Sequence, residues 1–248
     1  MEKNAYDEMF AVEDNHWWYV GLHDLALEIS DRLFSEQILE ILDAGCGTGG
    51  LISTLSSAGH AVEGMDYSEE AISYCHKRGL KNVFKADIND WTPNPASYDL
   101  IISMDVLCHK WVRDEVQVLK SLANGLKENG LLMLNYPAFP ILSRQHDKVV
   151  MIRERYTKQT IKQYLSEADL APVILSYRLP HAFLILLILR LYEASKSNNQ
   201  ETKSDIANIP SKFINQTLIT INKLENRLIA RGFSIPFGSS LFVVANQI

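Results

Sequence analysis

Residues 41–50 read ILDAGCGTGG. Apolar residues lead to an acid, Asp43, and glycines then alternate with small side chains. A strand that ends in a glycine turn and continues into a helix presents backbone N–H groups and a helix N-terminus to an anionic or polar ligand. The stretch therefore predicts a strand–turn–helix unit with a ligand close to the turn.

Outward from this unit, strand and helix patterns alternate along the chain after residue 37. Strands are expected at 38–44, 61–67, 82–88, 98–106, 131–137, 171–178 and 240–247. Helices are expected at 48–59, 68–78, 112–127 and 157–168. The alternation predicts an α/β fold: a Rossmann-like, seven-stranded, mostly parallel sheet with helices on both faces.

The domain organisation that we expect has three parts. Residues 1–37 form an N-terminal helical cap or lid, residues 38–178 with 237–248 form the Rossmann-like domain, and 179–236 form a helical insertion that covers the acceptor site. The insertion holds helical patterns at 181–196 and 210–231. The second pattern carries an apolar stripe: Phe213, Leu218, Ile221, Leu224 and Leu228.

The first insertion helix contains the longest apolar run, AFLILLIL at 182–189. Eight residues are too few to cross a bilayer, which takes about 20. The run meets an apolar acceptor, a membrane surface or a second subunit. We favour the acceptor pocket, because basic residues are sparse around the run and stable membrane attachment usually needs two signals.

Composition narrows the class of protein. With 248 residues, 47% hydrophobic and 22% charged, the chain is typical of a globular protein. A net charge of -6 argues against a nucleic-acid binder. Three cysteines without C-x-x-C spacing and a polar N-terminus favour a reducing compartment, the cytoplasm. No histidine pattern of the H-E-x-x-H kind occurs, so no metal is expected.

The glycines narrow the ligand to two candidates. Gly45, Gly47 and Gly50 satisfy G-x-G-x-x-G, and Asp66 follows 21 residues after Gly45, where a carboxylate can accept from ribose hydroxyls. This pattern fits NAD. Asp43 would repel a pyrophosphate but attract an ammonium and a sulfonium.

A third carboxylate, Asp87, ends the next strand and can accept from an adenine amino group, while Ile88 and Met65 sandwich the ring. A cationic adenosyl ligand without phosphate is S-adenosylmethionine. An NAD-dependent oxidoreductase stays open as the alternative, as does a non-catalytic protein that binds S-adenosylmethionine.

Several motifs carry a family resemblance: LDAGCGTGG, MDYS, ADI, YDLIISMDVLCH and LKENGLLMLNYP. They resemble, in order and at the expected strand ends, the motifs of class I S-adenosylmethionine-dependent methyltransferases. The segment EDNHWWYVGLHDL at 13–25 resembles the His-Trp-Trp segment of one bacterial branch, which often acts in natural-product or surface-glycan pathways.

The resemblance implies a role for each matching residue. The glycine turn lies under the methionine part, Asp43 orients its amino group, Asp66 takes the ribose hydroxyls, and Asp87 holds the adenine. Branch members often carry an Arg near position 23, where this chain has His23. The implied cofactor-binding residues are Asp43, Gly45, Cys46, Gly47, Gly49, Asp66, Tyr67, Ala86, Asp87, Ile88, Ser103, Met104 and His23.

The acceptor side should follow the fourth and fifth strands and include the N-terminal cap, since ligands of open α/β sheets bind beyond the carboxyl ends of the strands. His109 is the first candidate for a general base, and His146 with Asp147 as orienting acid is the second. An amine acceptor that arrives neutral would need neither. The expected substrate-binding residues are His16, Trp17, Trp18, Tyr19, Cys108 and Tyr136.

These residues together predict an enzyme that moves a methyl group from S-adenosylmethionine to an O or N atom of a small, partly hydrophobic metabolite. A natural product or a glycan or lipid precursor would fit that description. The expected partner is the small-molecule acceptor, without nucleic acid, and the protein is a monomer or a homodimer. The acceptor itself cannot be read from these residues, because loops and caps build its pocket.

Overall fold

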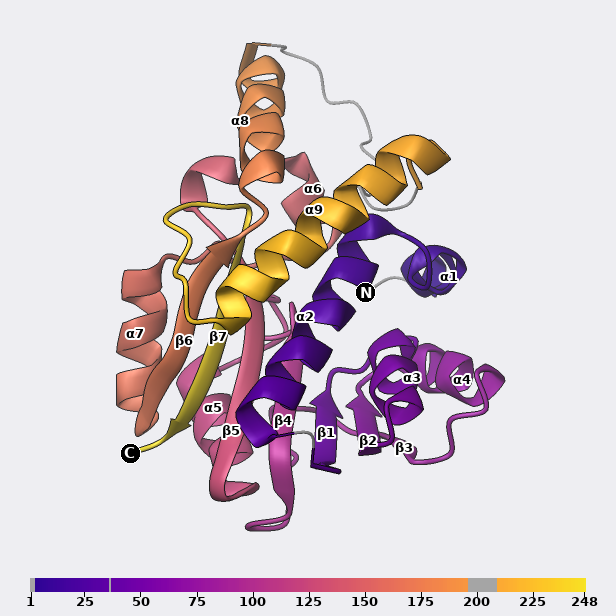
Figure 1. Ribbon diagram of the computed structural model, residues 1–248, viewed down its shortest axis with the longest axis vertical. Helices are drawn as coiled ribbons and strands as arrows, with labels where there is room; N and C mark the ends of the chain where they lie inside the picture. The colour runs from indigo at the N-terminus through magenta and orange to yellow at the C-terminus, as the bar shows by residue number, and fades with distance from the viewer. Residues whose placement is uncertain (1–2, 36, 196–208) are drawn as a thin grey trace.

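A computed structural model describes residues 3–35, 37–195 and 209–248, apart from the side chains of 3–4, 145–146 and 192–195. Seven strands form one sheet in the order β3-β2-β1-β4-β5-β7-β6 (Figure 1). Only β7 runs antiparallel to its neighbours. The strands are β1 (Glu40–Ala44), β2 (Ala61–Asp66), β3 (Val83–Lys85), β4 (Tyr98–Met104), β5 (Leu126–Pro137), β6 (Leu170–Arg178) and β7 (Ser240–Gln247). The predicted α/β fold is confirmed.

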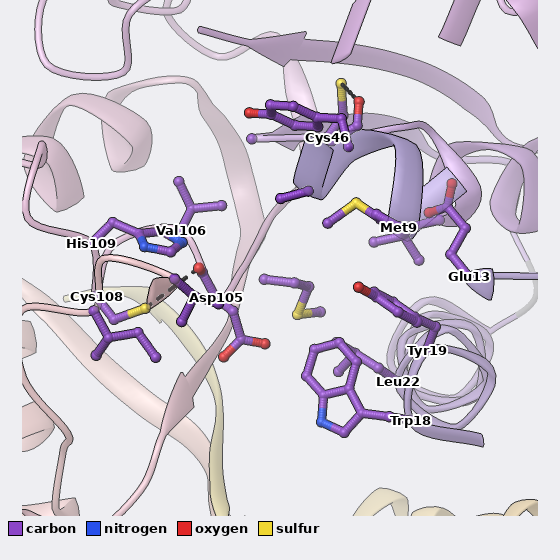
Figure 2. A pocket seen from close by; sticks show the side chains of 18 of the residues that line it. Met9, Glu13, Trp18, Tyr19, Leu22, Cys46, Asp105, Val106, Cys108 and His109 are labelled. Carbon is purple, nitrogen blue, oxygen red and sulfur yellow. Dashed lines mark hydrogen bonds between the residues drawn. The ribbon is translucent and has the colours of Figure 1, made fainter. Parts of the chain in front are cut away.

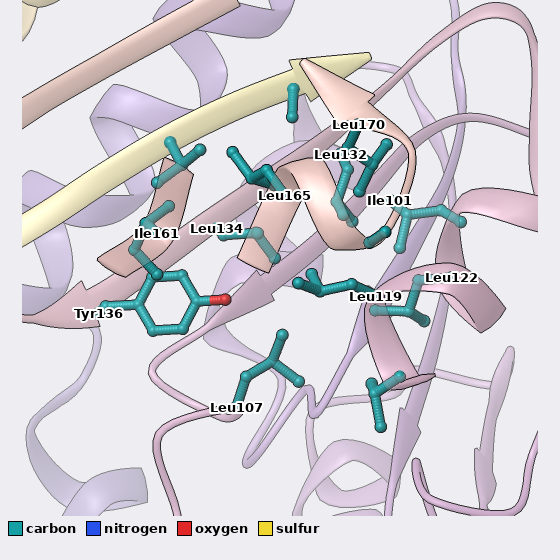
Figure 3. Close-up of a cluster of buried hydrophobic side chains, with 14 of the residues drawn as sticks. Ile101, Leu107, Leu119, Leu122, Leu132, Leu134, Tyr136, Ile161, Leu165 and Leu170 are labelled. Carbon is teal, nitrogen blue, oxygen red and sulfur yellow. The ribbon is translucent and has the colours of Figure 1, made fainter. Parts of the chain in front are cut away.

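Helices cover both faces of the sheet, as the alternation predicted. They are α1 (Lys3–Val12), α2 (Trp17–Phe34), α3 (Gly50–Ser57), α4 (Glu69–Lys77), α5 (Glu115–Asn124), the 3-10 turn η1 (Pro140–Leu142), α6 (Gln145–Val149), α7 (Lys158–Glu167), α8 (Pro180–Ser195) and α9 (Lys212–Ala230). One buried cluster joins α5 and α7 to the sheet (Figure 3), and a second joins α2, α3 and the end of α9 to the other face.

Strand alternation decides which side chains reach each cluster. In β5, Leu132, Leu134 and Tyr136 face the cluster under α5 and α7, whereas Met133 faces the cluster under α2. Figure 3 shows the Tyr136 ring among the side chains of that first cluster. Strand β5 thus contributes core residues on both faces.

Strand β5 begins five residues earlier than the sequence predicted. Asn129-Gly130 does not make a turn ahead of the strand but lies within it, with Asn129 at φ 63°. The pairing with β4 passes from Tyr98–Leu126 directly to Leu100–Leu131, so the extra residues form a bulge. The pairing of β5 with β4 therefore continues past Asn129-Gly130, although these two residue types are typical of a turn.

Helix α9 lies along α2 and turns its polar side inward. Asn222 Nδ2 donates to the Trp17 carbonyl at 3.0 Å, and Asn226 Nδ2 donates to the Gly21 carbonyl at 2.8 Å. A Cβ on Gly21 would come within 2.3 Å of Asn222 Nδ2, so glycine permits this close approach. The domain boundaries at 37, 178 and 236 stay predictions.

Within the described ranges, no helix is long and apolar enough to cross a membrane.

Candidate functional site

A cavity of about 1370 Å³ opens beyond the carboxyl ends of β1, β2 and β4 (Figure 2). Its walls come from the glycine turn, from α1 and α2, from the loop after β4 and from α8. Pockets for one small ligand usually measure about 300–1,000 Å³. This cavity therefore has room for a cofactor and a second molecule beside it.

The glycine turn forms the floor of the cavity. Gly45 and Gly47 line it with φ values of 95° and 53°, in the left-handed region that glycine tolerates. A Cβ on Gly45 would come within 2.3 Å of Val106 Cγ2. Gly49 ends the turn at φ 85° but faces Leu80 and not the cavity. Only the first two of these glycines allow a ligand to approach the backbone.

Two buried carboxylates stand at this floor. Asp43 lines the cavity, and burial, with Asp66 and Glu13 nearby, raises its pKa to about 8. Asp66 accepts from the backbone N–H of Gly47 at 3.0 Å and of Ser68 at 2.9 Å. Burial raises the pKa of Asp66 as well, against those hydrogen bonds. Ionisation of these carboxyl groups is therefore costly, and a bound cationic ligand would lower that cost.

A third acid at the floor, Glu13, was missed from the sequence. Its carboxylate caps α3: Oε2 accepts from Gly50 N at 3.3 Å and Oε1 accepts from the Thr48 hydroxyl. Arg78 Nη2 lies 2.6 Å from Glu13 Oε1, yet burial dominates and raises the pKa of Glu13. The sequence does hold one indication that another residue caps α3. Gly49, the N-cap residue, has no side chain, so it cannot accept from the free N–H groups at the start of the helix.

The side of the cavity after β3 carries the residues expected to hold an adenine. Ala86, Asp87 and Ile88 all line it. Asp87 Oδ1 accepts from Asn89 N at 2.9 Å and from Asn89 Nδ2 at 2.7 Å, which fixes the carboxylate. The cavity also touches Cys46, Met65 and Tyr67, so these residues lie together as the sequence predicted.

At the end of β4 the structure corrects one expectation. Met104 lines the cavity, but Ser103 is buried on the other side of the strand, where its hydroxyl donates to the Ala44 carbonyl at 2.8 Å. The pleat sends neighbouring residues to opposite faces, so both could not meet one ligand.

Asp105, the next residue, faces the cavity and was not predicted. It adopts φ 56°, unusual for a residue other than glycine, and accepts from Asn135 Nδ2 at 2.8 Å. Burial raises the pKa of Asp105 to about 6, opposed by Asn135, Arg178 and Arg155. Figure 2 shows its carboxylate between His109 and Trp18.

The start of α2 forms the opposite wall, with His16, Trp17, Trp18 and Tyr19 all against the cavity. His16 Nδ1 accepts from Trp18 N at 3.2 Å and so caps α2, while burial lowers the His16 pKa to about 4. Trp18 and Tyr19 meet edge to face at 4.9 Å. The aromatic segment therefore supplies a flat apolar wall.

Three histidine and cysteine candidates also line the cavity: His23, Cys108 and His109. Burial lowers the pKa of His23 to about 4, so at neutral pH it offers no charge to a cofactor carboxylate. The His109 ring stacks on Trp111 at 4.0 Å, and burial lowers its pKa to about 4. Neutral His109 is a proton acceptor of low basicity.

One acceptor-side prediction is wrong. Tyr136 is 1% exposed in the core and does not reach the cavity, because strand alternation points it under α5 and α7. Asp147 binds Arg155 with both oxygens, each at 2.7 Å, and so holds Arg155 at the cavity wall. The pairing of Asp147 with His146 stays a prediction. The side chain of His146 lies outside the described residues.

Part of this chain is similar to known sequences. The family model described as "Methyltransferase domain" matches residues 41–130. A probable S-adenosylmethionine-dependent methyltransferase of Mycobacterium tuberculosis is 28% identical over 99 residues, 40% of this chain and 35% of the relative. A ubiquinone biosynthesis O-methyltransferase of Rickettsia conorii is 32% identical over 120 residues, 46% of this chain and 40% of the relative. The chain thus spans well under two thirds of these relatives.

Solved structures share the fold over most of the chain. An S-adenosylmethionine-dependent methyltransferase from Mesorhizobium loti matches with a TM-score of 0.56 at 16% identity, covering 87% of this chain and 95% of that one. A putative methyltransferase in complex with the Haloferax volcanii Trm112 activator matches with a TM-score of 0.59 at 14% identity, over 97% and 96%. S-adenosylmethionine is the cofactor of this family. Residues 41–130 therefore match a methyltransferase domain, and the chain shares its fold with solved S-adenosylmethionine-dependent methyltransferases.

Proposed function

We propose that the protein transfers the methyl group of S-adenosylmethionine to an O or N atom of a small, partly hydrophobic metabolite, such as a natural product or a glycan or lipid precursor. One observation carries the proposal: Asp43, Asp66 and Asp87 line a single cavity together with Gly45 and Gly47 of the glycine turn. This arrangement fits a cationic nucleoside.

Each acid has a proposed partner on the cofactor. Asp43, whose pKa is raised to about 8, gains most from a positive neighbour and would hold the ammonium. Asp66 would accept from the ribose hydroxyls in addition to its two backbone N–H donors. Asp87 would accept from the adenine amino group, with Ile88 and Met65 on the ring faces.

The NAD alternative fits this floor poorly. A pyrophosphate over Gly45 and Gly47 would lie beside Asp43 and Asp66, and the charge of Asp66 already adds to the cost of ionising Asp43. Arg78 contacts the turn, but it is bound to Glu13 and Asp14 and does not line the cavity. Lys85 and Arg155 do line the cavity, and each is paired with an acid, Glu69 and Asp147 respectively. Among the described residues, a dinucleotide would therefore meet no unpaired lysine or arginine in the cavity.

For the proton that an acceptor hydroxyl or ammonium loses, we propose Asp105 as the base. The bound cofactor supplies a methyl carbon made electrophilic by the sulfonium. Asp105 faces the cavity between that site and the aromatic wall, and its pKa of about 6 keeps it ionised yet basic at neutral pH. His109, with a pKa of about 4, is the weaker base of the two.

Calorimetry tests the cofactor assignment. Wild-type protein should bind S-adenosylmethionine, and Asp66→Ala should lose binding of both the cofactor and 5′-methylthioadenosine, which shares the ribose. Asp31→Asn, at an exposed position on α2, is the matched control and should bind normally. Absence of binding by the wild type at tens of micromolar would end the proposal.

Turnover separates an enzyme from a non-catalytic binder. Methyl-labelled cofactor is incubated with the protein and the small-molecule fraction of an extract from its source, and mass spectrometry finds the compound that gains a methyl group. Asp105→Asn should lower that rate about 10²–10⁴-fold while cofactor affinity stays unchanged. A larger loss in His109→Ala than in Asp105→Asn would move the role to His109.

A further inference from the structure

An ordinary surface helix buries its apolar stripe. Helix α9 instead buries polar side chains and exposes apolar ones. The residues that it buries include Asn222, Glu225 and Asn226. Its outward side carries large apolar side chains that are 40–82% exposed: Phe213, Ile214, Ile221, Leu224 and Leu228. Among the described residues, nothing covers this stripe. The stripe that the sequence predicted is present, but it points away from the protein.

Helix α8 adds a second apolar surface. Leu184, Ile185, Ile188 and Leu191 are 56–67% exposed. Figure 1 shows α8 standing out from the body at the same end of the molecule as the N-terminal end of α9. With 16 residues it is about 24 Å long, shorter than the roughly 30 Å hydrocarbon core of a bilayer. Such a helix can lie on a membrane but not cross it.

The charges on α9 indicate what kind of surface covers it. Its exposed charged residues are all basic, Lys212, Lys223 and Arg227, and exposed Arg231 follows directly. Glu225, the single acid of α9, is buried and accepts from Leu179 N at 2.7 Å. The whole chain has a net charge of -6, whereas the exposed charged residues of α9 are positive, although Lys223 Nζ lies 4.0 Å from Asp24 Oδ1 of α2. Anionic lipid headgroups complement an apolar stripe flanked by basic residues.

We propose that the outward side of α9 together with α8, the α8–α9 surface, binds an anionic lipid bilayer. This binding goes beyond the proposed catalytic function and does not depend on it. Ala182, Leu186 and Leu189 of α8 also line the cavity, so the same helix faces both the bilayer and the site. Where the proposed function holds, an acceptor with an apolar tail reaches the cavity along α8.

Vesicle flotation tests the proposal with the full chain. Vesicles of phosphatidylcholine alone are compared with vesicles that also contain phosphatidylglycerol. Phe213→Ser and Leu224→Ser should each lower the partition coefficient about tenfold, because each removes one apolar side chain from the interface. Lys223→Gln and Arg227→Gln should each lower it about fivefold, only on the anionic vesicles and less at high salt.

Ile38→Ser is the matched control, since Ile38 is 78% exposed but precedes β1 at the opposite end of the strands. It should bind vesicles as the wild type does. Calorimetry with S-adenosylmethionine on every variant checks folding and separates failure of this proposal from failure of the proposed function.

Three results would overturn the proposal. One is a wild type that binds neither kind of vesicle, and another is undiminished binding by Phe213→Ser and Leu224→Ser. The third is a dimer in analytical ultracentrifugation that Phe213→Ser dissociates, since the stripe would then join two copies of the chain.

Discussion

Substitution of Asp43 by Asn should stabilise the unliganded protein and weaken cofactor binding at the same time. The carboxyl group has an ordinary pKa of 3.8, and in the folded protein burial raises its pKa to about 8. The folded state therefore holds a proton that the unfolded chain releases, and this penalty grows as pH rises from about 4 to about 8. An amide has no such penalty.

The size of the effect follows from the gap between the ordinary pKa of 3.8 and pH 7. At about 1.4 kcal/mol per pH unit, the gain in the free energy of unfolding is on the order of 4 kcal/mol. For a chain of this length that corresponds to roughly 10 °C in Tm. The cofactor should lose a charge-assisted hydrogen bond of about 1.5–3 kcal/mol, or roughly 10–150-fold in affinity.

Two assays check this reasoning. Thermal unfolding of wild type and Asp43→Asn, each without ligand, should give similar Tm values at pH 4 and diverge up to pH 8. Calorimetry should show weaker binding of S-adenosylmethionine and S-adenosylhomocysteine, which both carry the ammonium, but unchanged binding of 5′-methylthioadenosine, which lacks it. A Tm difference that does not change with pH, or equal losses for all three ligands, would refute the assignment of Asp43 to the ammonium.

Further substitutions test the other parts of the site. Gly45→Ala should abolish cofactor binding measured by calorimetry, because its Cβ would meet Val106 Cγ2 at 2.3 Å and φ is 95°; near-normal affinity would show that the turn adapts. Arg78→Met should lower the free energy of unfolding, measured with urea, by about 3–5 kcal/mol, since it leaves the carboxylate of Glu13 buried without its partner. Glu13→Gln added to Arg78→Met should recover part of that loss. Trp18→Ala should lower kcat/KM for the acceptor about 10-fold or more while cofactor affinity stays constant, because the ring lines the cavity on the side where we propose that the acceptor binds.

The parts of the site that lie at strand ends were predictable from the sequence. Asp43 lies near the end of β1, Asp66 ends β2 and Asp87 comes shortly after β3, and parallel strands bring their carboxyl ends to one edge of a sheet. Local periodicity placed the strands and helices to within a few residues. It did not reveal the bulge at Asn129-Gly130, because a turn signal and a bulge use the same residues.

Side-chain direction was the commonest source of error. Ser103 and Tyr136 lie in the correct strands, yet each points into the core because of its place in the pleat. Asp105 was not predicted, although it lines the cavity beside His109, with its backbone at φ 56°. A shift of one residue along a strand moves a side chain to the opposite face of the sheet. The end of a strand therefore predicts where a site lies more reliably than it predicts which side chains line that site.

The sequence by itself determined the order of the elements, the glycine turn and the acids around it, since these depend on local propensity and on position along a strand. Only the tertiary structure decided the contacts between distant segments: Glu13 with Arg78, and the polar side of α9 with the backbone of α2. An apolar stripe at helical spacing predicts a helix, but which side it buries depends on what packs against it. Here the carbonyl groups of α2 bind the asparagines of α9, so the stripe faces outward.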